Sequence, residues 1–72
     1  MVSSRTLSDI WDDMSLEQQD SISRMICNAI RYGYFDPDNL YTQDREIYRH
    51  FNGEQRRLAN WIIGKWLEEF EQ

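Results

Sequence analysis

Three aspartates, Asp36, Asp38 and Asp44, have the spacing with which a calcium-binding loop begins. An EF-hand loop starts with acidic residues two positions apart, has a glycine at its sixth position and ends on a bidentate glutamate at its twelfth. If Asp36 is the first position, Tyr41 stands where the glycine is required and Ile47 stands where the glutamate is required. We therefore interpret the three acids as turn and helix-cap residues, and we expect no metal site.

Cys27 and His50 are the only cysteine and the only histidine of the chain. A single cysteine excludes an intrachain disulfide and a cysteine-based metal site, and it is typical of a reducing compartment. Cys27 lies off the apolar face of its predicted helix, so we expect a partly exposed thiol. A nucleophilic cysteine needs a base held beside it, and nothing in the spacing places His50 there. We expect the histidine at an exposed helix position.

No other pattern in the chain is typical of an enzyme. The three glycines are isolated from one another, so no glycine-rich loop is available to hold a phosphate. Adjacent carboxylates occur, but general acid–base catalysis needs a cleft around them, and a helical chain of 72 residues rarely encloses one. We therefore expect neither enzyme activity nor a cofactor.

Trp61 does not fit the amphipathic pattern of its predicted helix. On a helical wheel it lies about 150° from the middle of the apolar arc, on a stripe that also carries Arg57 and Gly64. Two explanations are open: the N-terminal segment, with Leu7 and Trp11, folds over the indole, or the indole meets a partner. Gly64 lowers helix stability relative to alanine and lets another backbone come close.

Charged residues are distributed unevenly, although the net charge is −5. The acids gather near the start of the chain, and the arginines of the second half cluster at positions 45, 49, 56 and 57. This cluster either forms ion pairs with Asp44, Glu46 or Glu54, or serves as a patch for a phosphate backbone or an acidic protein surface. The predicted partner-binding residues are Trp61 as anchor, Arg57, Lys65 and Gly64 beside it, and Arg45 and Arg49 as steering charges.

The elements that position these residues are predicted to be helices, because apolar residues recur at three and four positions and nowhere alternate. Thr6 with Asp9, Ser15 with Gln18 and Asn52 with Gln55 have the spacing of helix caps, Thr42 or Asp44 can cap the third helix, and Gly33 can end the second. Pro37 breaks the chain after the second helix. We predict helices over 7–13, between Ser15 and Gly33, over 43–51 and over 54–70.

These helices predict an all-α fold, a compact small bundle of about four helices, one short and three longer. The wheel places Ile26, Ile30, Ile62 and Trp66 at the centre of the core. The length allows one domain over residues 1–72, with residues 1–5 expected to be disordered. No apolar run is long enough for a membrane span or a signal sequence, so we expect a cytoplasmic protein.

The function that these observations favour is that of a small acidic, non-enzymatic regulator or inhibitor that occupies a surface of a larger protein. Small acidic helical proteins of this kind are common in bacteriophages and mobile elements. One alternative is a DNA-binding regulator that uses the second and third helices as a helix-turn-helix, which the negative net charge opposes. Another is a structural homo-oligomer, in which Trp61 and Gly64 meet a second copy.

Overall fold

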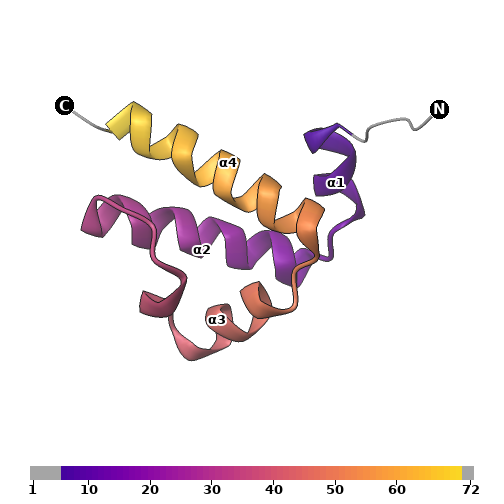
Figure 1. Cartoon of the computed structure of the whole chain (residues 1–72), viewed down its shortest axis with the longest axis horizontal. Coiled ribbons are helices and arrows are strands. Elements are labelled where there is room, and N and C mark those ends of the chain that lie inside the picture. Colours follow the sequence, from indigo (N-terminus) through magenta and orange to yellow (C-terminus); the bar gives the residue numbers. More distant parts are fainter. Residues whose placement is uncertain (1–5, 71–72) are drawn as a thin grey trace.

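The computed structural model describes residues 6–70, which form four α-helices and one short 3-10 helix with no strand (Figure 1). This confirms the predicted all-α bundle. The helices are α1 (Leu7–Asp13), α2 (Leu16–Tyr32), η1 (Pro37–Asn39), α3 (Thr42–Arg49) and α4 (Gly53–Phe70). Only α2 and α4 are long, since α3 has 8 residues and α1 has 7. The predicted disorder of residues 1–5 lies outside the described residues.

Local capping chemistry sets most of the helix boundaries. Three helices begin with a reciprocal pair of hydrogen bonds, in which a side-chain oxygen at the cap accepts from a backbone N–H three residues later and the second side chain accepts from the cap residue. At α2, Gly33 adopts a left-handed conformation with φ of 84°, which ends the helix. The pairs are Thr6 with Asp9, Ser15 with Gln18, and Asn52 with Gln55.

The predicted cap of α3 is wrong. The helix begins one residue earlier than expected, at Thr42, and the cap position is held by Tyr41, which forms no side-chain cap bond. Asp44 is buried inside the first turn of α3, where it bonds to α2 instead of capping its own helix. The local pattern assigns this carboxylate to a helix cap, but in the folded chain it bonds to Ser21 and Arg24 of α2.

The two long helices form the centre of the molecule. Figure 1 shows α2 and α4 side by side and running in the same direction, with α3 packed below α2 and α1 beside the start of α4. A hydrogen bond of 2.7 Å from the Gln19 amide to the carbonyl oxygen of Trp11 holds α1 to α2. None of the helices in residues 6–70 has the length and apolar content that crossing a bilayer requires.

The core is displaced from the centre that the helical wheel predicts. Ile26, Ile30 and Ile62 are only partly buried, and Trp66 is 44% exposed, so the prediction that these four residues form the core centre is wrong. The reason is that α1 has only 7 residues and covers only the first part of the α2–α4 pair. The buried apolar side chains are Ile10, Met14, Ile22, Met25, Ala29, Leu40, Phe51, Leu58, Ala59 and Ile63.

Candidate partner-binding site

Trp61 lies where α4 passes α1, and 49% of the residue is exposed. It borders an open hollow of about 250 Å³ lined by Leu7, Ser8, Trp11, Leu58, Trp61 and Ile62. Coverage of Trp61 by the N-terminal segment is therefore only partial. Leu7 and Trp11 of α1 do reach this part of α4, but they leave about half of the tryptophan in contact with solvent.

Lys65 lies one turn after Trp61 and fixes the surroundings of the indole. Its Nζ atom is 5.8 Å from the centroid of the Trp61 ring, a cation–π distance, and 3.9 Å from Oε1 of Glu68. The ammonium group therefore rests between an aromatic face and a carboxylate, with more than half of its side chain exposed. An incoming group meets the indole and this positive charge together.

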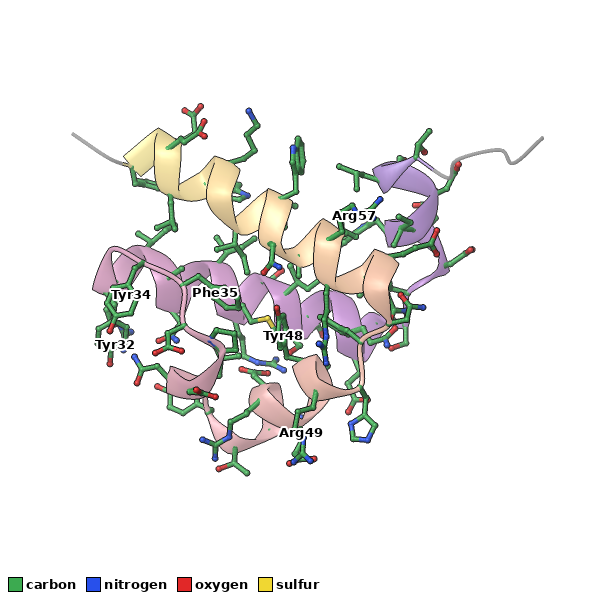
Figure 2. All side chains as sticks on the ribbon, in the orientation of Figure 1. Tyr32, Tyr34, Phe35, Tyr48, Arg49 and Arg57 are labelled. Carbon is green, nitrogen blue, oxygen red and sulfur yellow. The ribbon has the colours of Figure 1, made fainter. Side chains whose placement is uncertain are left out.

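Gly64 and Arg57 complete the predicted group on α4. A Cβ atom added at Gly64 meets no atom within 4 Å, so no close packing inside the described part of the chain requires the glycine. Arg57 is exposed, and Figure 2 shows it on the part of α4 nearest α1. Within residues 6–70, no side chain pairs with its guanidinium group. The structure thus carries Arg57, Trp61, Gly64 and Lys65 on one helix.

Arg45 and Arg49 do not join that group. Both are exposed on α3, and Figure 2 shows Arg49 and Arg57 on different sides of α2. Arg45 Nη1 donates to the carbonyl oxygen of Asp38 at 3.4 Å, and Arg49 Nη1 lies 3.1 Å from Oε2 of Glu46. The predicted six residues therefore form two separate groups, four on α4 and two on α3.

Arg56 has a structural role in the arginine cluster. Its Nη2 donates to the carbonyl oxygen of Arg49 at 3.0 Å, and its guanidinium carbon lies 5.5 Å from the centroid of the Tyr48 ring. The Tyr48 hydroxyl in turn donates to Oδ1 of Asn60 at 3.3 Å. These contacts hold α3 against α4. The predicted ion pairing of the cluster is thus found for Arg49 with Glu46, while Asp44 pairs elsewhere.

Asp44 is the centre of a buried polar network between α2 and α3. The residue is 2% exposed, and its Oδ1 accepts from the hydroxyl of Ser21 at 2.9 Å. Arg24 donates from Nε and Nη2 to the same carboxylate at 3.0 and 2.8 Å. The hydrogen bond to Asp44 raises the pKa of Arg24 above its ordinary value. Sequence spacing suggests instead that Arg24 pairs with Asp20 on its own helix.

A pair of exposed aromatic residues lies at the end of α4. Trp66 and Phe70 stack with ring centroids 6.0 Å apart and planes 15° apart, and Phe70 is 55% exposed. Together with Lys65 and Glu69 they line an open hollow of about 400 Å³. The helical wheel does not indicate this surface, because it places Trp66 in the core. Trp66 and Phe70 lie one helical turn apart, as do Lys65 and Glu69, and all four come after the part of α4 that α1 reaches. This spacing is the sequence pattern that indicates the surface.

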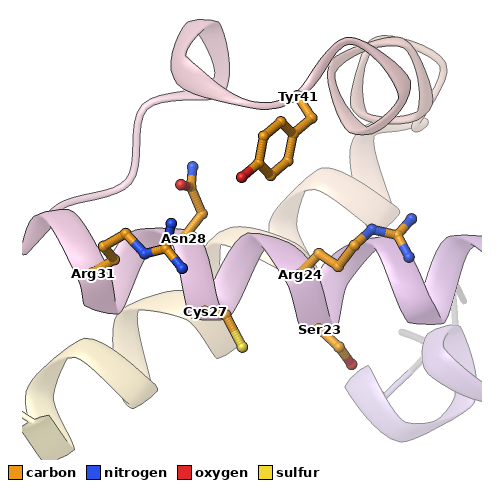
Figure 3. A pocket seen from close by; sticks show the side chains of 6 residues that line it. All are labelled: Ser23, Arg24, Cys27, Asn28, Arg31 and Tyr41. Atoms are coloured by element: carbon orange, nitrogen blue, oxygen red, sulfur yellow. The ribbon is translucent and has the colours of Figure 1, made fainter.

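Cys27 has the exposed position that the wheel predicts. It lines a shallow hollow of about 230 Å³ with Ser23, Arg24, Asn28, Arg31 and Tyr41. Figure 3 shows that the Cys27 and Ser23 side chains point away from the side of α2 on which Tyr41 lies, so these groups do not converge on one point. His50 is exposed, as expected, and its Nδ1 lies 2.9 Å from the carbonyl oxygen of Glu46.

Among residues 6–70, no three His, Cys, Asp or Glu side chains gather closely enough to hold a metal ion. Comparison of the chain with protein-family models, with curated proteins and with solved structures finds no match.

Proposed function

We propose that this chain is a small, non-enzymatic regulator or inhibitor that acts by occupying a surface of a larger protein, to which it docks through the outer face of α4. The observation that carries the proposal is the position of Trp61, half exposed at the edge of an apolar hollow. Tryptophan is among the residues that most often dominate the energy of protein interfaces, since it buries a large rigid area at one point.

The surroundings of Trp61 favour a protein partner over a small molecule. The hollow beside it is open and lined almost entirely by apolar side chains, which suits an apolar side chain inserted from a partner. Arg57 and Lys65 supply positive charges on the same helix, so a partner with an apolar group flanked by acids is complementary to this surface.

The DNA-binding alternative gains less support from the arrangement of the helices. A helix-turn-helix joins its two helices by a turn of about three or four residues. Here residues 33–41, which include the 3-10 helix η1, lie between α2 and α3. Arg56 is engaged in contacts between α3 and α4, and the net charge is −5. A gel shift with random duplex DNA at several salt concentrations separates the two functions, because phosphate binding weakens steeply with salt.

The test uses the 72-residue chain, tagged and incubated with extract of the cells that produce it. Mass spectrometry identifies the captured protein, and the affinity is then measured with the purified partner. We expect Trp61→Ala to weaken the complex at least about tenfold. Tyr41→Ala is the matched control, because Tyr41 is an exposed aromatic residue on another face, and it should leave the affinity unchanged. Unchanged affinity of a folded Trp61→Ala variant would refute the site.

A further inference from the structure

The side of α4 on which α1 packs is covered along only part of its length. At its start, Leu7 and Trp11 of α1 lie against Leu58 and Ile62 of α4. Beyond Ile62, α2 still buries Ile63, but no element in residues 6–70 covers Trp66 and Phe70, which remain 44% and 55% exposed. These two aromatic side chains form an apolar surface without an occupant.

This uncovered surface is continuous. Phe70 lines the hollow of about 400 Å³ on the outer side of α4, and also a second hollow of about 260 Å³ toward the end of α2. We call the surface the C-terminal strip. It consists of Ile30, Trp66, Leu67 and Phe70, with Gly33 at its far edge. Exposed aromatic side chains that adjoin partly buried aliphatic ones in this way are typical of an interaction surface.

The charged residues beside the strip are complementary to the same residues of a second, antiparallel copy. Lys65 and Glu69 lie one helical turn apart and line the same hollow as Trp66 and Phe70. Within residues 6–70 Glu69 has no ion pair, and the carboxylate nearest to Lys65 is that of Glu68, at 3.9 Å. A two-fold axis perpendicular to α4 and level with residues 67–68 sets Lys65 of each copy against Glu69 of the other. The same rotation brings the two Trp66–Phe70 stacks together.

The length of the strip also suits a second copy of α4. Residues 63–70 extend for about 12 Å, or about two helical turns, and the axis places Phe70 of the second copy level with residues 64–66 of the first. Phe70 of the second copy therefore lies past the part of α4 that Leu7 and Trp11 of α1 reach, so this contact does not require α1 to move. The contact is small, so we expect a weak dimer rather than an obligate one.

We propose that the C-terminal strip binds a second copy of this chain in an antiparallel two-fold dimer. Trp66 and Phe70 form its apolar centre, and two reciprocal Lys65–Glu69 contacts form its edge. The proposal does not depend on the partner proposed for Trp61. It also differs from an oligomer built on Trp61 and Gly64, because its centre lies further along α4, at Trp66 and Phe70.

The first test is a charge exchange, read by sedimentation equilibrium from micromolar to near-millimolar concentration. The wild-type chain should approach twice its mass of 8.8 kDa. Lys65→Glu and Glu69→Lys should each weaken the dimer about tenfold, or ~1.4 kcal/mol, because each turns two attractions into two repulsions. An equimolar mixture of the two variants should dimerise again, because every edge contact in the mixed dimer joins an acid to a base.

The mixture separates pairing between copies from local effects, because damage within either variant would not be repaired by adding the other. Phe70→Glu should prevent dimerisation, whereas Trp61→Ala should leave it intact. Circular dichroism of dilute samples checks that each variant is folded. A wild-type chain that stays monomeric at all concentrations overturns the proposal. So does a mixture that stays monomeric, or a dimer that Phe70→Glu does not affect.

Discussion

At the scale of single residues, the carboxylate of Asp44 determines how α3 docks on α2. Asp44→Ala leaves the buried hydroxyl of Ser21 without its acceptor and removes both hydrogen bonds from Arg24. We expect the free energy of unfolding to fall by about 2–3 kcal/mol. The loss stays below that of a fully buried ion pair because almost half of the Arg24 side chain is in solvent. Urea denaturation at neutral pH measures it.

Asp20→Ala is the control for this prediction. Asp20 is exposed and one turn before Arg24, so the substitution removes a carboxylate near the same guanidinium without touching the buried network. Its effect should stay within about 0.5 kcal/mol. If Asp20→Ala destabilised the protein as much as Asp44→Ala, the network would not be the source of the stability.

The sequence predicts residue roles well where partners are close along the chain. The caps at Thr6, Ser15 and Asn52 follow from spacing because donor and acceptor lie three residues apart. The partner of Arg24 lies 20 residues away, so no local rule selects Asp44 over Asp20. The docking of α3 makes that choice, and it was not predictable from the pattern of charges.

At the scale of elements, two glycines allow a matched comparison. A Cβ atom at Gly33 or at Gly64 meets no atom within 4 Å, so the two sites differ mainly in backbone conformation. Gly33→Ala places alanine at φ of 84° and should lower stability by about 1 kcal/mol. Gly64→Ala lies inside α4 and should raise stability by up to about 1 kcal/mol. Thermal melts of both variants check the opposite signs.

If both variants changed the stability in the same direction, this account of the glycines would be wrong.

The Gly64 variant also tests the proposed partner site. If a partner backbone approaches α4 closely at Gly64, the substitution should stabilise the free chain and weaken the complex at once. A purely structural role for Gly64 would leave the affinity for the partner unchanged.

The apolar arc of α4 is predictable from the sequence, but the depth of burial along it is not. A helical wheel treats the covering partner as equally long as the helix, whereas α1 has 7 residues and α4 has 18. Ile63 is therefore buried while Trp66, on the same arc, is almost half exposed. Two of the four predicted core residues, Ile30 and Trp66, belong to the C-terminal strip that α1 does not reach.

This difference in burial leads to a stability prediction. Ile63→Ala should cost about 2–5 kcal/mol, because it opens a cavity in the buried core that also contains Met25 and Ala59. Trp66→Ala should cost only about 2 kcal/mol in dilute solution, because much of the residue is already in water. Urea unfolding compares the two variants. If the Trp66→Ala chain were unfolded, Trp66 would contribute to stability as a core residue does, and the prediction would be wrong.

At the scale of the whole molecule, the uneven charge distribution acts at a distance from the Trp61 site. Arg45 and Arg49 are exposed on α3, apart from α4, so a partner docked through Trp61 meets their electrostatic field before contact. Charges of this kind change the association rate more than the lifetime of a complex. Arg57, which lies on the docking helix itself, should instead change the dissociation rate.

Arg49→Gln should therefore slow association with the partner about two- to threefold at low ionic strength and leave dissociation nearly unchanged. The difference should fade as salt shortens the screening distance below about 10 Å. Arg31→Gln removes the same charge from α2 and is the matched control for net charge. Stopped-flow or surface plasmon measurements over a salt series give both rates. If both variants slowed association equally, the effect would come from net charge alone. If Arg49→Gln changed only the dissociation rate, Arg49 would be a contact residue of the complex.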